Sequence, residues 1–207
     1  RLFLSTLLAS AVAAFAPHAA HADVYEIDSG HSSAGFSVRH LMVSNVHGAF
    51  STVNGTVDIN DKDLTKSTLD VSIDAGSINT REPKRDEHLK SADFFDVAKF
   101  PKITFKSKKV AKAGKLLKVT GDLTIHGVTK EVVLDVEGPT PTIKDPWGNT
   151  KRGASATAKI SRKDFGLAWN KALEAGGVVV GHEIKINIDV ELLTKAAPAP
   201  TLAPPPP

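Results

Sequence analysis

Alternation of apolar and polar residues recurs along most of the chain and restricts the fold more than any other feature of the sequence. In the stretch HEIKINIDVEL, Ile184, Ile186, Ile188 and Val190 share one parity, and charged or amide residues fill the other. Successive side chains of a β-strand point to opposite faces, so this stretch predicts a strand with one buried face. The same period appears in residues 69–75, 102–108, 118–127, 132–138 and 154–161.

Two further stretches near the start, residues 34–41 and 47–59, are also typical of strands. In the second, Phe50 and Val53 fall on opposite parities, which predicts a bulge or bend near Ser51 and Thr52. Turn residues such as Ala113-Gly114 and His126-Gly127 separate the segments. About eight short strands divided by turns, without βαβ units, predict an all-β antiparallel sandwich or barrel.

The two ends of the chain differ in composition from the part between them. Residues 1–22 are apolar and rich in small residues and end in Ala20-His21-Ala22, a pattern that predicts a secretory signal peptide; an N-terminal membrane anchor is the alternative. Residues 196–207 form a Pro/Ala tail that we expect to be disordered. One domain is therefore expected over residues 23–195, and the absence of cysteine fits a bacterial periplasm.

The stretch KRDEHLKSADFFD breaks the alternation. Pro83 suits a first helical turn, and Asp86 and Lys90 have the spacing of a favourable pair, so we expect a short, solvated helix. If the helix starts near Arg81, then Arg81, Arg85 and His88 share one face. That face is either a contact for a ligand's head group or simply a solvated basic surface. Phe94 and Phe95 would anchor the segment.

Motifs for catalysis and for metal binding are missing from the sequence. There is no G-x-S-x-G, P-loop or H-E-x-x-H, and Asp86 and Glu87 are adjacent rather than facing each other. None of the histidines after residue 22 pairs at a spacing that directs two imidazoles at one ion. Interspersed charges give no indication of nucleic-acid binding. The lysines at 102, 106, 108, 109 and 112 suit either transient contact with an anionic membrane surface or a solvated strand face.

The interior of such a barrel is the remaining candidate for a site. Ala154, Ala156 and Ala158 place only methyl groups on the inner parity of one strand, whereas neighbouring strands offer valine, leucine and phenylalanine. Small barrels normally fill their interior with large side chains. The alanines therefore indicate either an unfilled apolar space or interdigitation with bulky residues from facing strands, and the pattern alone does not choose.

Five long motifs resemble the YceI-like family of bacterial periplasmic proteins: GFSVRHLMVSNVHGAF, KRDEHLKSADFFDVAKFPKITFKS, VTGDLTIHGVTKEVVLDV, DPWGN and ISRKDFGLAWNKALEAGGVVVGHEIKINIDVEL. The resemblance runs from about Val24 to Leu193 and leaves the Pro-rich tail outside. It implies a lipocalin-like antiparallel β-barrel with an apolar pocket for a long isoprenoid or similar lipid. It also implies that there are no established catalytic residues and no cofactor besides the bound lipid or quinone.

Taken with this resemblance, strand parity predicts the residues that contact the ligand. The expected wall consists of Phe36, Val38, Phe50, Leu69, Val71, Ile73, Phe94, Phe95, Phe105, Leu123, Ala154, Ala156, Ala158 and Trp169. Arg81, Arg85 and His88 are the candidate head-group contacts, on a short lid helix with a wet outer face. No metal ligand is expected.

The leading hypothesis is therefore a periplasmic carrier that binds or sequesters a lipid, and not an enzyme. An enzyme acting on an isoprenoid head group is the rival, and a structural or stress protein with an incidental pocket is a third reading. The sequence leaves open which lipid is bound, the pathway, and whether the protein is a monomer or a homodimer.

Overall fold

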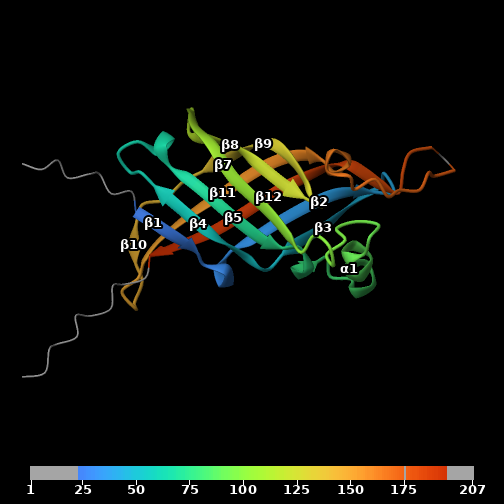
Figure 1. Ribbon diagram of the computed structural model, residues 1–207, viewed down its shortest axis with the longest axis horizontal. Coiled ribbons are helices and arrows are strands. Elements are labelled where there is room, and N and C mark those ends of the chain that lie inside the picture. The colour runs from blue at the N-terminus through green and yellow to red at the C-terminus, as the bar shows by residue number, and fades with distance from the viewer. Residues whose placement is uncertain (1–22, 175, 195–207) are drawn as a thin grey trace, which may run out of the picture.

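The computed structural model describes residues 23–174 and 176–194, and strands dominate it (Figure 1). The predicted signal peptide and Pro-rich tail lie outside the described residues. The strands are β1 (Asp23–Ile27), β2 (Ser33–His40), β3 (Ser44–Phe50), β4 (Val53–Ile59), β5 (Thr68–Asp74), β6 (Ile78–Asn79), β7 (Lys102–Ala113), β8 (Leu116–Ile125), β9 (Val128–Glu137), β10 (Ile143–Lys144), β11 (Thr150–Ser161) and β12 (Val180–Thr194).

Eight of these strands form a closed antiparallel ring in the order β11-β9-β8-β7-β5-β4-β1-β12, and β12 pairs with β11 to close it. The β11–β12 pairing is continuous from Thr150↔Thr194 to Ser161↔Glu183. By contrast, β9 and β11 pair only from Ser155↔Glu137 to Thr157↔Asp135. The expected all-β antiparallel barrel of about eight strands is thus confirmed.

Three of the ring positions are occupied by two successive strands each. β1 and β2 lie end to end along β12, separated by the 3₁₀ turn η1 (Ser29–His31). β3 and β4 are likewise interrupted only at Ser51 and Thr52, where the sequence predicts a bend. The interruption lets Phe50 and Val53 both point inward, and they are 7% and 1% exposed. β5 and β6 form the third composite strand, around η3 (Ala75–Ser77).

One end of the barrel is filled by side chains. Tyr25, Ile59, Val119 and Leu192 are at most 3% exposed there, because they come from strand segments that converge at this end. Arg152 lies over the Tyr25 ring, with its guanidinium carbon 5.8 Å from the ring centroid, and its Nη1 donates to Asp61 Oδ1 at 2.7 Å. This end is therefore closed by packing.

The opposite end carries the helix α1 (Pro83–Lys90), which lies next to the ends of β3 and β5/β6 (Figure 1). The buried Thr80 ties it down: Asp86 Oδ1 accepts from Thr80 N at 2.8 Å and from Thr80 Oγ1 at 2.5 Å. Leu89 is the helix residue that packs against the hydrophobic core. Among the described residues, no helix has the length and apolar character needed to cross a membrane.

Two details of the predicted helix are wrong. The helix begins at Pro83 with Glu82 as its N-cap, so Arg81 lies outside it, with a left-handed φ of 66°. Arg81 N donates to Asn79 Oδ1 at 2.8 Å, a local turn that competes with the helix. Lys90 pairs with Glu87 at 3.0 Å rather than with Asp86, whose carboxylate is already bound to Thr80.

Candidate ligand-binding site

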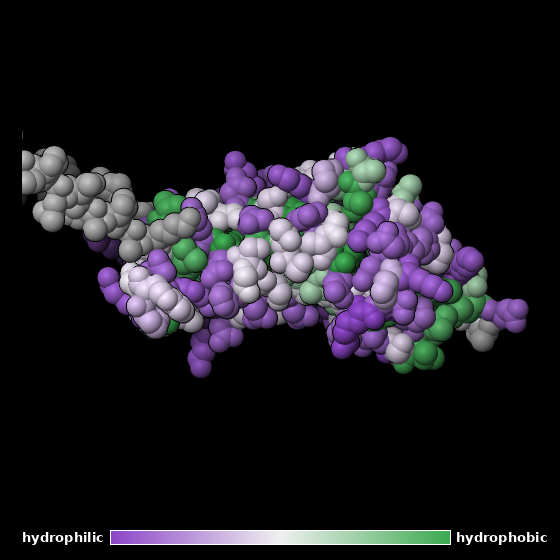
Figure 2. Space-filling view, turned by 90° about the horizontal axis from the view of Figure 1, so that it is seen from below, coloured by the Kyte–Doolittle hydropathy of each residue, from purple (hydrophilic) through white to green (hydrophobic). Residues whose placement is uncertain are grey.

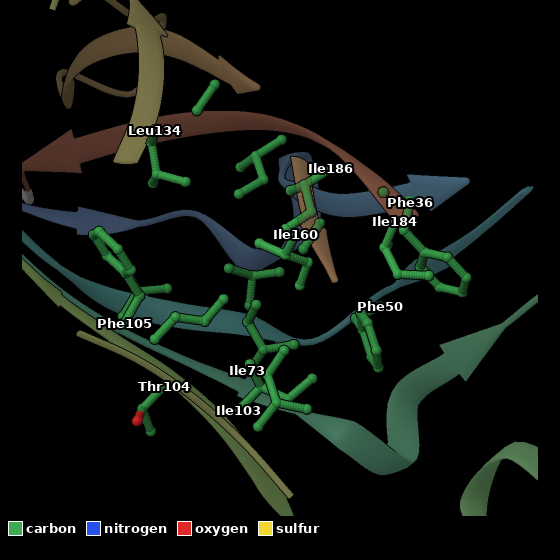
Figure 3. A pocket seen from close by; sticks show the side chains of 18 of the residues that line it. Phe36, Phe50, Ile73, Ile103, Thr104, Phe105, Leu134, Ile160, Ile184 and Ile186 are labelled. Carbon is green, nitrogen blue, oxygen red and sulfur yellow. The ribbon is translucent and has the colours of Figure 1, made fainter. Parts of the chain in front are cut away.

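An apolar cavity of about 220 Å³ occupies the barrel interior between the filled end and the α1 end. It is more than ten times larger than the roughly 10–15 Å³ that one water needs, and apolar cavities stay dry. Its wall is built from the inward rows of the strands, as Figure 3 shows for Phe36, Phe105, Ile160 and Ile186. Such a space suits a hydrocarbon chain.

Small side chains on β11 help to keep this interior open. Ala156 lies between Val136 of β9 and Ile188 of β12 in the strand register, and all three line the cavity. Ala154 lines it as well, opposite Val190. Since both alanines line the cavity, their methyl groups border open space rather than an interdigitated core.

The α1 end of the cavity is covered by aromatic side chains. Phe36, Phe50 and Phe95 follow one another, with ring centroids 5.8 Å and 5.6 Å apart. Leu89 of the helix and Phe94 complete this cover from the outside of the barrel end. The hydrogen bonds between Thr80 and Asp86 hold α1 in place. We therefore call α1 and the segment up to Phe95 the lid of the cavity.

Arg162 is the one charged residue that lines the cavity in the part of the chain that the structure describes. It opens the 3₁₀ turn η4 (Arg162–Phe165) and is 3% exposed. Its guanidinium donates to the carbonyl oxygens of Gly181 at 2.8 Å, Val180 at 3.3 Å and Leu167. Burial lowers the pKa of Arg162 from its usual value. Its hydrogen bonds tie the η4 segment to β12, so we assign it the role of holding the cavity wall together.

Twelve of the predicted wall residues do lie in the cavity wall: Phe36, Val38, Phe50, Leu69, Val71, Ile73, Phe94, Phe95, Phe105, Leu123, Ala154 and Ala156. Two do not. Ala158 packs against the core beyond the point where β9 leaves β11. Trp169 is outside the cavity wall and packs against Phe94, with ring centroids 5.2 Å apart and ring planes tilted by 45°. That the twelve bind a ligand remains a prediction.

The three candidate head-group residues do not form the expected stripe, and none of them lines the cavity. Arg81 is outside the helix. Arg85 donates to Thr80 Oγ1 at 2.7 Å and to Thr80 O at 2.8 Å, so its guanidinium braces the lid. His88 Nε2 lies 2.8 Å from Asp93 Oδ2, and its ring meets Phe94 and Trp169 edge to face.

Sequence reasoning missed part of the wall. Ile184, Ile186, Ile188 and Val190 line the cavity, and their shared parity was the available signal. Phe165, Leu167 and Arg162 also line it, from a segment without any period. Arg162 continues the even-numbered row of β11, so extending that row by one position would have found it.

A second cluster, outside the cavity, brings Asp28, His31 and Glu191 together with their ligand atoms within 4.8 Å of one another. Lys151 Nζ already lies among them, 3.3 Å from Asp28 Oδ2 and bonded to Glu191. The hydrogen bond from His31 lowers the pKa of Asp28, and the bond to Glu191 raises the pKa of Lys151. We therefore interpret the cluster as a charge network that links the η1 turn to β11 and β12.

Comparison with known proteins adds to this picture. The sequence profile of the YceI-like domain matches residues 25–192. A UPF0312 protein of Staphylococcus aureus strain MSSA476 is 41% identical over 169 residues, which are 81% of this chain and 95% of the relative.

Solved structures share the fold. A Campylobacter jejuni YceI protein is 37% identical and superimposes with a TM-score of 0.64, over 76% of this chain and 90% of that one. BcnA of Burkholderia cenocepacia reaches a TM-score of 0.68 at 20% identity, covering 82% and 99%. A polyisoprenoid-binding domain from Saccharophagus degradans reaches 0.59 at 17% identity, covering 83% and 98%. At such low identities, the last two show a common fold only.

Proposed function

This chain belongs to the family of YceI-like domains, and from that premise we propose that its barrel binds and carries a long isoprenoid or similar lipid. The observation that carries the proposal is the cavity of about 220 Å³, which is walled mainly by aliphatic and aromatic side chains. An apolar chain gains about 0.8 kcal/mol for each CH₂ that it buries, so a long chain can be held without any charged contact. The polyisoprenoid-binding domain of Saccharophagus degradans, which shares the fold, supports the choice of ligand class.

The polar groups of the wall support binding rather than catalysis. Thr104, Ser155 and Arg162 are the polar residues of the wall within the described part of the chain, and the Arg162 donors are bound to carbonyl oxygens. A general acid or base must reach the reacting group in a productive geometry. An enzyme acting on the head group would need such residues at the α1 end, where Arg85 and His88 are already engaged.

We further propose that the protein acts in the periplasm, on the strength of the signal-like residues 1–22 and the absence of cysteine. Mass spectrometry of protein secreted by a Gram-negative host tests this. We expect a mature chain that begins at Asp23. Protein that keeps residues 1–22 and stays in the membrane fraction would instead indicate an anchor.

The binding proposal is tested by extracting protein purified under native conditions with organic solvent and identifying the extract by mass spectrometry. A carrier should release about one chemically unchanged long-chain lipid per barrel. Incubation of delipidated protein with polyprenyl phosphates and quinones then separates the rivals. Turnover into new products would favour the enzyme, and an empty barrel that takes up neither compound would refute the proposal.

A further inference from the structure

The turn between β2 and β3 places three consecutive apolar residues in solvent. Leu41, Met42 and Val43 are 40%, 38% and 74% exposed, and we call these three residues the apolar tip. Figure 2 shows hydrophobic surface gathered at the corresponding end of the molecule. Hairpin turns are ordinarily polar and rich in Asn, Asp and Gly, so solvent exposure does not explain this choice of residues.

Backbone conformation does not explain the choice either. Leu41 and Met42 adopt left-handed φ angles of 50° and 62°, which Gly and Asn tolerate and which cost bulky residues free energy. The strained turn is nevertheless held firmly. Arg39 donates to Met42 O at 2.8 Å, and Leu41 N donates to Val179 O at 2.8 Å. Apolar side chains therefore occupy positions where both the turn and the solvent disfavour them, as at a functional surface.

The surroundings of the apolar tip are basic. Arg39 and His40 precede it, and Lys171 lies on the segment that hydrogen-bonds to it through Val179, whose N donates to Lys171 O at 3.0 Å. Residues 39–43 and 171–179 contain a single acid, Glu174. Apolar side chains next to segments that carry Arg39 and Lys171 match a bilayer interface, where the apolar side chains enter the acyl boundary and the cations meet anionic headgroups.

The cavity lies directly behind the apolar tip. Val38, just before Arg39, and Val180, just after Val179, both line the cavity. Val180 also pairs with His40, which precedes the apolar tip. The other end of the barrel is closed by Tyr25, Ile59 and Leu192. A lipid that enters or leaves must therefore pass the end that carries both the lid and the apolar tip.

We infer that Leu41, Met42 and Val43 insert into the surface of an anionic lipid bilayer and place the lidded end of the cavity against it for lipid exchange. The purpose of this contact rests on the proposed function, whereas the contact itself can be measured separately. Even a single myristoyl chain gives only marginal, reversible binding, so three partly exposed side chains give a transient contact suited to a shuttle. A second copy of this chain is the poorer occupant, because it would bring the basic residues together and bury far less than the roughly 1,000 Å² of a stable interface.

The test uses flotation of the full chain with vesicles of phosphatidylcholine and phosphatidylglycerol. The variant carries Leu41→Asn and Met42→Gly, a pair that favours left-handed φ, so its melting temperature should hold or rise. Its partitioning onto vesicles should fall about tenfold or more, because the variant lacks the two apolar side chains that wild type transfers from water into the bilayer. Lys171→Gln should weaken binding to the anionic vesicles only, in a salt-dependent way.

The matched control removes exposed apolar surface elsewhere. Ile143→Asn with Trp147→Ser strips side chains that are 62% and 80% exposed, on β10 and the turn after it, at the opposite end of the molecule from α1 (Figure 1). We expect this control to bind vesicles within about twofold of wild type, because the apolar tip is intact. Vesicle binding that survives in the tip variant, or that disappears in the control, would overturn the inference. So would a concentration-dependent dimer that the tip variant abolishes.

Lipid content distinguishes failure of this inference from failure of the proposed function. A tip variant that still holds lipid but exchanges it slowly with vesicles supports both. A wild-type barrel without lipid that still binds vesicles through the apolar tip would sink the proposed function and leave the docking surface standing.

Discussion

Replacing Ala156 with phenylalanine separates an open cavity from a filled core. Ala156 is 9% exposed, lines the cavity, and faces Val136 and Ile188 across the neighbouring strands. In a core that is already full, the added ring would overpack and cost about 1–3 kcal/mol of stability. In a cavity of about 220 Å³ the ring has room, so the lipid-free variant should be as stable as wild type or more stable.

The same ring should exclude ligand. It adds six carbons to the middle of the cavity, where a bound chain would lie. Displacement of only three methylenes, at about 0.8 kcal/mol each, costs about 2.4 kcal/mol, or roughly a 60-fold loss of affinity. A filled core and an open cavity therefore predict stability changes of opposite sign for Ala156→Phe. An open cavity also predicts a large loss of bound lipid.

The assay is urea unfolding of delipidated wild type and Ala156→Phe, with lipid content measured by mass spectrometry. Thr157→Phe is the matched control, because it adds the same ring on the exposed face of the same strand. Its stability should stay within about 0.5 kcal/mol of wild type and its lipid content should be unchanged. A destabilised Ala156→Phe that keeps its full complement of lipid would refute our assignment of the wall.

Three further changes test the lid, the wall and the pH response. Asp86→Ala removes the acceptor of both Thr80 hydrogen bonds and should cost about 1–3 kcal/mol of stability. It should also speed lipid transfer to acceptor vesicles in stopped-flow experiments. An unchanged transfer rate would show that α1 does not control access to the cavity. Arg162→Met keeps the apolar stem of the side chain but leaves buried carbonyl oxygens without donors, so urea unfolding should show a loss of stability of about 3 kcal/mol or more. Unchanged stability would show that water replaces the guanidinium. His182, whose buried Nδ1 has no hydrogen-bond partner among the described residues, has a pKa lowered by burial and by the charges of Lys163 and Arg162. The imidazole of His182 therefore binds a proton more readily in the unfolded chain than in the folded one, and wild type should lose stability as the pH falls below 6.5, the ordinary pKa of histidine. His182→Gln should reduce this dependence of stability on pH. An unchanged pH dependence in His182→Gln would show that the imidazole is solvated.

Local pattern was sufficient to predict the walls of the barrel. The alternation around Ile184 and Ile188 marks the inward row of β12, because a strand with one wet face has no other way to bury those side chains. The opposite parities of Phe50 and Val53 even located the break between β3 and β4. What the pattern could not supply is which strands lie end to end, since that depends on pairing with β12, far away in the sequence.

The lid shows why the rest of the site could not be predicted. Helical periodicity assigned Arg81 and Arg85 to one face, but Asn79 captures the Arg81 amide and Thr80 captures the Arg85 guanidinium. These are hydrogen bonds of particular side chains, and periodicity carries no information about them. The apolar tip was missed for a related reason, because only the observed φ angles of Leu41 and Met42 mark that turn as strained.

The most direct test of the central claim is methyl NMR of isoleucine-labelled protein loaded with a polyprenyl lipid. If the chain lies in the cavity, nuclear Overhauser contacts to lipid methyl groups should appear at Ile73, Ile103 and Ile186, which line it. Ile59, buried at the filled end, and Ile143, exposed on the surface, should show none. Contacts confined to Ile143, or a loaded protein whose Ile73, Ile103 and Ile186 signals match those of the lipid-free form, would contradict a lipid-carrying barrel.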